Sequence, residues 1–186
     1  MGFTVNEGII AEVSKSEKTE IFFNGKSINF PTVKTAVRKL TKEKIRIFIK
    51  SKLPLGCGFG LSGASALATA YAVNKLLNLR KNPKELALIA HTAEVENKTG
   101  LGDVVNQFFG GFCVKFKPSS HFIVEKLQFN NTEIYCKYFS KISTKSVMTN
   151  PKLKNRINKT ASTALNKTKR LIKNDKEANL RQIIRI

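Results

Sequence analysis

The 186-residue sequence lacks tryptophan and is poor in acidic residues and cysteine. Thirteen Asp and Glu stand against 33 Lys and Arg, which gives a formal net charge of +20. The three cysteines, Cys57, Cys113 and Cys136, are odd in number, widely spaced and free of any Cys-x-x-Cys pair, which fits neither a disulfide framework nor a zinc site. A reducing, cytoplasmic environment is the simplest interpretation.

Signals for export or a membrane span are also missing. Residues 1–6 offer no basic segment followed by an apolar core, so a signal peptide is not predicted. Residues 53–74 carry no charge, but the first half of this stretch is rich in Gly, Pro and Ser, which argues against a transmembrane helix. Hydrophobic residues make up 41% of the chain and include 13 Phe, so we expect a packed core.

The positive charge is concentrated toward the end of the chain. Residues 1–139 contain 20 Lys and Arg against 11 acids, whereas residues 140–186 contain 13 against two. A basic tail raises the alternative of a nucleic-acid-binding module. Its cations are scattered among Asn, Thr and Ile, and no RRM-like, KH-like or paired-ligand zinc pattern accompanies them. We therefore favour a solvated helical face and treat nucleic acid as the weaker alternative.

A glycine-rich stretch lies between a predicted strand and a predicted helix. Residues 44–51 alternate Ile with Arg, Phe and Lys, which is typical of a half-buried strand, and residues 62–77 are rich in Ala and Leu, which favours a buried helix. Between them, residues 54–66 read PLGCGFGLSGASA. Glycines let backbone N–H groups approach an oxyanion, and a helix N-terminus adds unpaired donors and the positive end of its dipole. The stretch therefore predicts a phosphate-binding loop.

Two common phosphate motifs do not fit this loop. Residues 58–63 satisfy G-x-G-x-x-G, but a dinucleotide fold requires a further strand ending in an acidic ribose ligand, and here Asn82-Pro83 and a second helix follow. A Walker A loop requires Gly-Lys-Ser/Thr at its end, and here Gly63 is followed by Ala64.

Local signals predict the remaining elements. Asn24-Gly25 indicates a hairpin turn, and Asn82-Pro83-Lys84-Glu85 indicates a helix start with a capping box. That helix is expected to fray near residues 97–100, where Gly100 supplies the stop. Residues 100–103 are expected to form a tight turn. Strands are expected at residues 2–13, 20–23, 26–30, 112–117, 121–129 and 132–139, the last two joined by Asn130-Asn131, and further helices from Pro31 and over 151–174.

Two stretches carry a family resemblance. Residues 54–64 read Pro, three residues, then Gly-Phe-Gly-Leu-Ser-Gly-Ala, and residues 90–105 read AHTAEVENKTGLGDVV before Gly110-Gly111. The first resembles the second signature of the GHMP small-molecule kinases, which is Pro, three residues, then Gly-Leu-Gly-Ser-Ser-Ala. Both stretches together are similar to the archaeal pantoate kinases of that superfamily.

The resemblance implies ATP-dependent phosphorylation of the hydroxyl of pantoate or a similar hydroxy acid, a step toward coenzyme A, with Mg²⁺ as cofactor. It implies that Ser62 and Glu94 bind Mg²⁺ and that Asp103 acts as a base or orients the acceptor. It implies that the loop wraps the ATP phosphates through Gly56, Gly58, Gly60, Leu61, Ser62, Gly63 and Ala64. The expected partner is a small molecule, with no membrane, and a homodimer is left open.

Each role has a plainer alternative. Ser62 would equally serve as a helix cap, and Asp103 in its Gly-flanked turn would equally make only local backbone hydrogen bonds. Glu96 competes with Glu94 for the metal. His91 is better explained as a core histidine than as an acid–base group. For the whole chain, the alternatives are a GHMP kinase acting on another small alcohol, an incomplete or inactive fragment, and the nucleic-acid-binding module.

The resemblance also implies a fold and a division of the chain. We expect an α+β domain like domain 2 of ribosomal protein S5, with a mixed sheet and helices on one face. Residues 1–139 would form the N-terminal, ATP-binding domain without its first segment, and residues 140–186 the basic, partly helical start of a C-terminal domain. Gly63 stands where the family usually has Ser or Ala.

Overall fold

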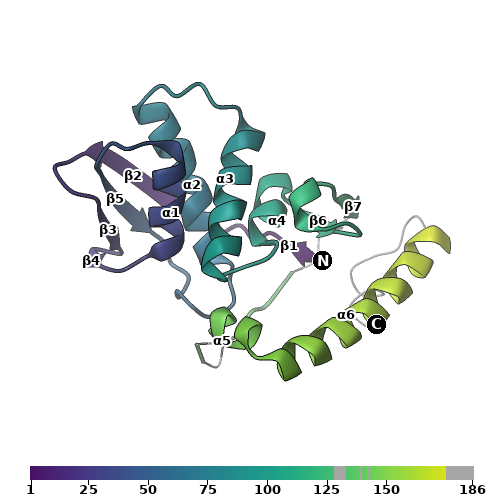
Figure 1. Cartoon of the computed structure of the whole chain (residues 1–186). Coiled ribbons are helices and arrows are strands. Elements are labelled where there is room, and N and C mark those ends of the chain that lie inside the picture. Colours follow the sequence, from purple (N-terminus) through teal and green to yellow (C-terminus); the bar gives the residue numbers. More distant parts are fainter. Residues whose placement is uncertain (128–132, 139, 142, 175–186) are drawn as a thin grey trace.

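The computed structural model describes residues 1–127, 133–138, 140–141 and 143–174. Its strands are β1 (Gly2–Phe3), β2 (Ile10–Lys15), β3 (Glu20–Phe23), β4 (Lys26–Ser27), β5 (Ile45–Lys50), β6 (Phe112–Val114) and β7 (Glu125–Leu127). Its helices are α1 (Pro31–Leu40), α2 (Leu61–Leu76), α3 (Pro83–Asn97), α4 (Asp103–Phe109), α5 (Thr144–Thr149) and α6 (Pro151–Asn174), with a 3₁₀ turn at Ser119–His121. The expected α+β architecture is present (Figure 1).

A mixed sheet forms one side of the molecule. Its strand order is β2-β5-β3-β4, with β5 antiparallel to β2 and parallel to β3. Along β5, Ile45, Ile47 and Ile49 are buried while the residues between them are exposed, which confirms the half-buried strand. Figure 1 shows α1, α2 and α3 on one side of this sheet, and these helices pack against one another.

The β3–β4 hairpin turns at Asn24 and Gly25, as predicted. Both residues have positive φ, 48° and 79°. Two consecutive positive φ values match the right-handed twist of the flanking strands, which is why Asn-Gly is favoured in such turns. The second strand is shorter than predicted, because β4 ends at Ser27 and the chain then turns into α1.

The start of α3 confirms the predicted capping box. The Asn82 side chain accepts a hydrogen bond from the Glu85 amide at 3.0 Å, and the Glu85 carboxylate accepts one from the Asn82 amide at 2.8 Å. The helix ends at Asn97, within the segment predicted for its end, but the residue predicted to stop it was wrong. Lys98, with φ of 55°, takes the left-handed position that ends the helix, and not Gly100.

The predicted strand over residues 2–13 was wrong, because the structure divides it between two sheets. β1 pairs with β6 in a three-stranded antiparallel sheet ordered β1-β6-β7, whereas β2 belongs to the mixed sheet. The residues between β1 and β2 form no strand.

The segment after α3 also differs from the sequence-based prediction. Residues 103–109, over which no helix was predicted, form the short helix α4. The strands predicted at 112–117 and 121–129 contract to β6 and β7, and residues 133–138 form no strand. Asn130 and Asn131, the predicted turn, lie outside the described residues.

The predicted helix over residues 151–174 is confirmed as α6, but most of its first half is exposed. Its last turns reach the three-stranded sheet, where Leu171 packs with Phe112, Leu127 and Ile134. Lys169 lies over the Phe116 ring at 5.4 Å from its centre. The domain boundary between residues 139 and 140 stays a prediction. In the part of the chain described here, no helix has the length and apolar character needed to cross a membrane.

Candidate active site

The glycine-rich loop joins β5 to α2 and ends in a helix start that no side chain of the described residues caps. Gly56, Gly58 and Gly60 have φ values of 82°, 85° and 65°, a backbone region that side chains with a Cβ rarely adopt. Gly60 is the N-cap residue of α2, and the first hydrogen bond of the helix runs from the Ala64 amide to the Gly60 carbonyl at 3.1 Å. The preceding backbone N–H groups are therefore available to an anion such as a phosphate.

Ser62 does not cap this helix, so that alternative is wrong. It lies inside the first turn of α2, and its hydroxyl donates to Thr32 Oγ1 at 3.0 Å. Thr32 is fully buried in α1 and also contacts the Thr99 hydroxyl at 2.9 Å. Ser62 is thus tied to a neighbouring helix through its side chain.

Asp103 and Gln107 bring α4 against the end of the loop. The Gln107 amide nitrogen donates to the Gly60 carbonyl at 2.9 Å. A Cβ on Gly60 would lie 3.0 Å from that nitrogen and 3.4 Å from the Asp103 Cβ, so the absence of a side chain at Gly60 allows this close approach. The structure therefore places Asp103 next to the predicted phosphate loop, at the first residue of α4.

A cavity of about 510 Å³ opens between the loop, α4 and the β1 strand. Asp103, Asn106 and Gln107 line it from α4. Of the residues predicted to bind ATP, those that line it are Gly58, Gly60, Leu61 and Ala64. Gly56, Ser62, Gly63 and Glu94 do not line this cavity, although Gly63 and Ser62 belong to the same helical turn as Leu61.

Glu94 is fully buried in α3, and its carboxylate lies between two glycines. A Cβ on Gly63 would lie 2.8 Å from Glu94 Oε2, and one on Gly100 would lie 2.6 Å from Glu94 Oε1. Neither carboxylate oxygen makes a hydrogen bond with a well-formed geometry among the described residues. Burial, together with the Asp103 charge, raises the pKa of Glu94 to about 8, although the Val104 amide and Lys115 oppose the shift.

Lys115, which sequence analysis did not single out, supplies a cation to this site. Its ammonium donates to the Gly102 carbonyl at 2.8 Å, immediately before Asp103. Burial raises the pKa of Asp103 and lowers the pKa of Lys115, and the attraction between the two groups opposes both shifts. Lys115 follows β6 directly, and nothing in the sequence around it distinguishes it from the other lysines.

Glu96, the competitor of Glu94, points to another surface. Its carboxylate pairs with Lys39 of α1 at 2.7 Å, and its side chain is half exposed. His91 is buried and packs edge-on against Phe122, with ring centres 5.9 Å apart. Burial lowers the pKa of His91, with a contribution from Lys115, so the neutral form is favoured. These surroundings favour a core role for His91.

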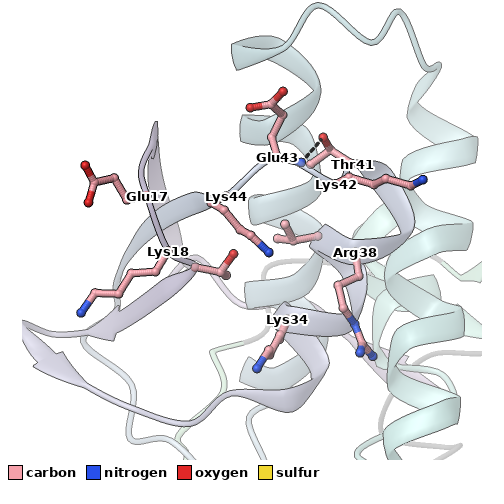
Figure 2. A pocket seen from close by; sticks show the side chains of 10 residues that line it. Glu17, Lys18, Lys34, Arg38, Thr41, Lys42, Glu43 and Lys44 are labelled. Carbon is pink, nitrogen blue, oxygen red and sulfur yellow. Dashed lines mark hydrogen bonds between the residues drawn. The ribbon is translucent and has the colours of Figure 1, made fainter.

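A second hollow of about 510 Å³ lies at the C-terminal end of α1 (Figure 2). Five cations and two acids line it, namely Lys18, Lys34, Arg38, Lys42, Lys44, Glu17 and Glu43. All seven side chains are exposed, and cations at a helix C-terminus complement its dipole without any ligand. None of the predicted site residues lines this hollow, so we regard it as a solvated basic surface.

Comparison with known proteins agrees with the geometry. Residues 31–111 match the family described as GHMP kinases N terminal domain. The pantoate kinase of Methanocaldococcus jannaschii is 35% identical over 178 residues, covering 93% of this chain and 63% of the relative. The pantoate kinase of Methanospirillum hungatei JF-1 is 38% identical over 96 residues, covering 52% of this chain and 33% of the relative.

A solved structure described as "Phosphotransferase related to CoA biosynthesis pathway" superimposes with a TM-score of 0.59 at 28% sequence identity. The superposition covers 68% of this chain and 47% of that protein. The chain therefore spans less than two thirds of the length of each of these three proteins. The glycine-rich loop, α3 and α4 all lie within residues 31–111, the part of the chain that is similar to the N-terminal domain of the GHMP kinases.

Proposed function

We propose that the chain is the ATP-binding part of a kinase that transfers the terminal phosphoryl group of ATP to the hydroxyl of pantoate. The observation that carries this proposal is the junction between the loop and α4. There Gly60 and Asp103 line one cavity, and Gln107 holds the Gly60 carbonyl. A phosphate on the loop and an acceptor hydroxyl in the cavity would meet at Asp103.

Phosphoryl transfer requires positioning and charge stabilisation more than covalent chemistry. The uncapped start of α2 and the loop backbone would bind the phosphate oxygens through N–H groups. The positive φ values of Gly58 and Gly60 turn this backbone toward the cavity edge without steric strain. Gln107 would keep the loop in that conformation by its bond to Gly60.

The residues present fit Mg²⁺. A fully buried carboxylate whose oxygens make no well-formed hydrogen bond among the described residues calls for a proton or a cation, and Glu94 is such a group beside Gly63. Among the described residues, no group of three His, Cys, Asp or Glu side chains forms a metal cage. This agrees with the preference of Mg²⁺ for one or two protein oxygens plus substrate phosphates. Glu94 and Ser62 would hold the ion, which would neutralise charge on the phosphates.

Asp103 would accept or orient the proton of the acceptor hydroxyl. Its carboxylate lies at the cavity wall, and Lys115 favours its ionised form against the effect of burial. An ionised carboxylate accepts a hydrogen bond from an alcohol, which directs the oxygen lone pair toward the phosphate.

Pantoate as the acceptor rests on the relatives, since two proteins named pantoate kinase share 35% and 38% identity with this chain. Mass spectrometry of the chain incubated with ATP, Mg²⁺ and pantoate tests this function, with mevalonate, homoserine and galactose as competing acceptors. We expect a phosphorylated product from pantoate alone. Phosphorylation of another acceptor in its place would overturn the pantoate assignment, and no product from any of the four would overturn the activity of this chain.

A further inference from the structure

We propose that Thr32 and Thr99 are positioning residues that commit the Ser62 hydroxyl to binding a cation through its oxygen and prevent it from donating to a phosphate. This inference rests on the proposed function, because the cation is the one that would accompany ATP. It concerns three hydroxyl groups that come from separate parts of the sequence: the first turns of α1 and α2, and the turn after α3.

The three hydroxyls form a continuous hydrogen-bonded chain. Ser62 Oγ donates to Thr32 Oγ1 at 3.0 Å, and Thr32 Oγ1 lies 2.9 Å from Thr99 Oγ1. Thr99 Oγ1 then reaches the backbone carbonyl of Glu94 at a longer distance of 3.5 Å, a carbonyl that also accepts from the Thr99 amide at 3.1 Å. The chain thus begins at one expected Mg²⁺ ligand and ends on the backbone of the other.

The number of protons on the three hydroxyls determines which hydroxyl donates in each hydrogen bond. Each hydroxyl has one proton and two lone pairs. Because the Thr99 proton points to the Glu94 carbonyl, which can only accept, the proton between the two threonines belongs to Thr32. Thr32 therefore accepts from Ser62 and donates to Thr99. Ser62 uses its only proton in the hydrogen bond to Thr32, and both lone pairs of its oxygen stay available.

Burial makes this arrangement persistent. Thr32 has no exposed surface, so its hydroxyl cannot exchange its protein partners for water. Leaving a buried hydroxyl unpaired costs about 1–3 kcal/mol, which holds Ser62 and Thr99 to their partners. A Ser62 oxygen with free lone pairs suits a cation, whereas a phosphate oxygen needs a donor that Ser62 no longer has.

The experiment measures ATP affinity of the 186-residue chain by calorimetry, once with Mg²⁺ and once in EDTA. The ratio of the two affinities reports the contribution of the metal. Thr32→Val removes the hydroxyl at nearly constant shape, and Thr32→Ser retains it. Thr35→Val is the matched control, since Thr35 is also buried in α1 but its hydroxyl contacts Arg38 and Asn97.

We expect Thr32→Val to lower the Mg²⁺-dependent ratio by about tenfold or more, as is usual when a partner of a metal ligand is lost, while affinity in EDTA is kept or increased. Thr32→Ser restores the ratio. Thr35→Val lowers the melting temperature without changing the ratio. A wild-type chain that binds MgATP and a Thr32→Val chain with the same ratio would overturn this inference alone. A wild-type chain that binds no MgATP would overturn the proposed function and this inference with it.

Discussion

The carboxylate of Glu94 lies against Gly100 so closely that the turn after α3 has no room for a side chain at this position. A Cβ there would lie 2.6 Å from Glu94 Oε1 and 2.9 Å from its Cδ atom. Gly63 meets the same carboxylate from α2, with 2.8 Å from an added Cβ to Oε2. Two glycines distant in sequence therefore enclose the fully buried carboxyl group of the site.

Gly100→Ala is expected to lower the free energy of unfolding by about 1–3 kcal/mol, the usual cost of overpacking a closed site. Urea unfolding of the metal-free chain measures this. Gly8→Ala is the matched control, because an added Cβ at Gly8 meets no atom within 4 Å of the described structure. Equal stability of the two variants would mean that the Glu94 carboxylate moves freely away from Gly100.

Glu94→Gln is expected to change how stability depends on pH. The ordinary pKa of the group is 4.5, and burial raises the pKa of Glu94 to about 8 in the folded chain. Between these values the folded chain holds a proton that the unfolded chain has released. Its free energy of unfolding therefore falls as pH rises from about 5 to about 8, by at most about 1.4 kcal/mol per pH unit.

The test is urea unfolding in EDTA at several pH values. Asp103 and His91 also titrate, but they do so in both proteins, so the difference between wild type and Glu94→Gln isolates Glu94. The variant should be the more stable protein at pH 8 and nearly equal at pH 4.5. Glu96→Gln, at an exposed position, should follow the wild type. Parallel pH profiles for Glu94→Gln and wild type would contradict the raised pKa.

Local signals in the sequence predicted the parts of the fold that depend on neighbouring residues. Asn24-Gly25 and the Asn82 to Glu85 capping box are two such signals, and both are present in the structure. Each is a set of contacts within four residues, so composition and order suffice to specify it. The alternation in residues 45–50 was equally informative, because one face of β5 is buried.

Contacts between distant residues were not predictable in this way. Residues 2–13 have the composition of a single strand, but β1 finds its partner at β6, more than 100 residues away. The hydrogen bond from Gln107 to Gly60 spans 47 residues, and no local sequence signal at either position predicts this contact. Lys115 reaches the Gly102 carbonyl, next to Asp103, only because β6 packs against α4. These tertiary contacts form the candidate site.

Asp103→Asn is expected to abolish phosphoryl transfer while leaving ATP binding nearly unchanged. The amide retains the size of the side chain but loses the acceptor charge, and general base groups contribute about 10²- to 10⁴-fold to rate. Turnover with pantoate and calorimetry with MgATP measure the two quantities separately. Equal turnover in the variant and the wild type would contradict a role for Asp103 in proton transfer or orientation.

Lys115→Met is expected to move the acidic limb of the pH–rate profile to higher pH. Burial already raises the pKa of Asp103, and Lys115 opposes that rise, so removal of the ammonium leaves the carboxylate protonated up to a higher pH. The exposed Lys117→Met is the matched control and should keep the wild-type profile. A shift of the limb to lower pH, or no shift, would show that Lys115 does not act on Asp103.

Binding of MgATP to the glycine-rich loop tests the central claim most directly. Calorimetry of the 186-residue chain at millimolar MgATP should give a saturable heat. Gly60→Ala should lose it, because the added Cβ falls at a φ of 65° and 3.0 Å from the Gln107 amide nitrogen. No heat from the wild-type chain, or the same heat from the Gly60→Ala variant, would contradict the assignment of this loop as the ATP phosphate site.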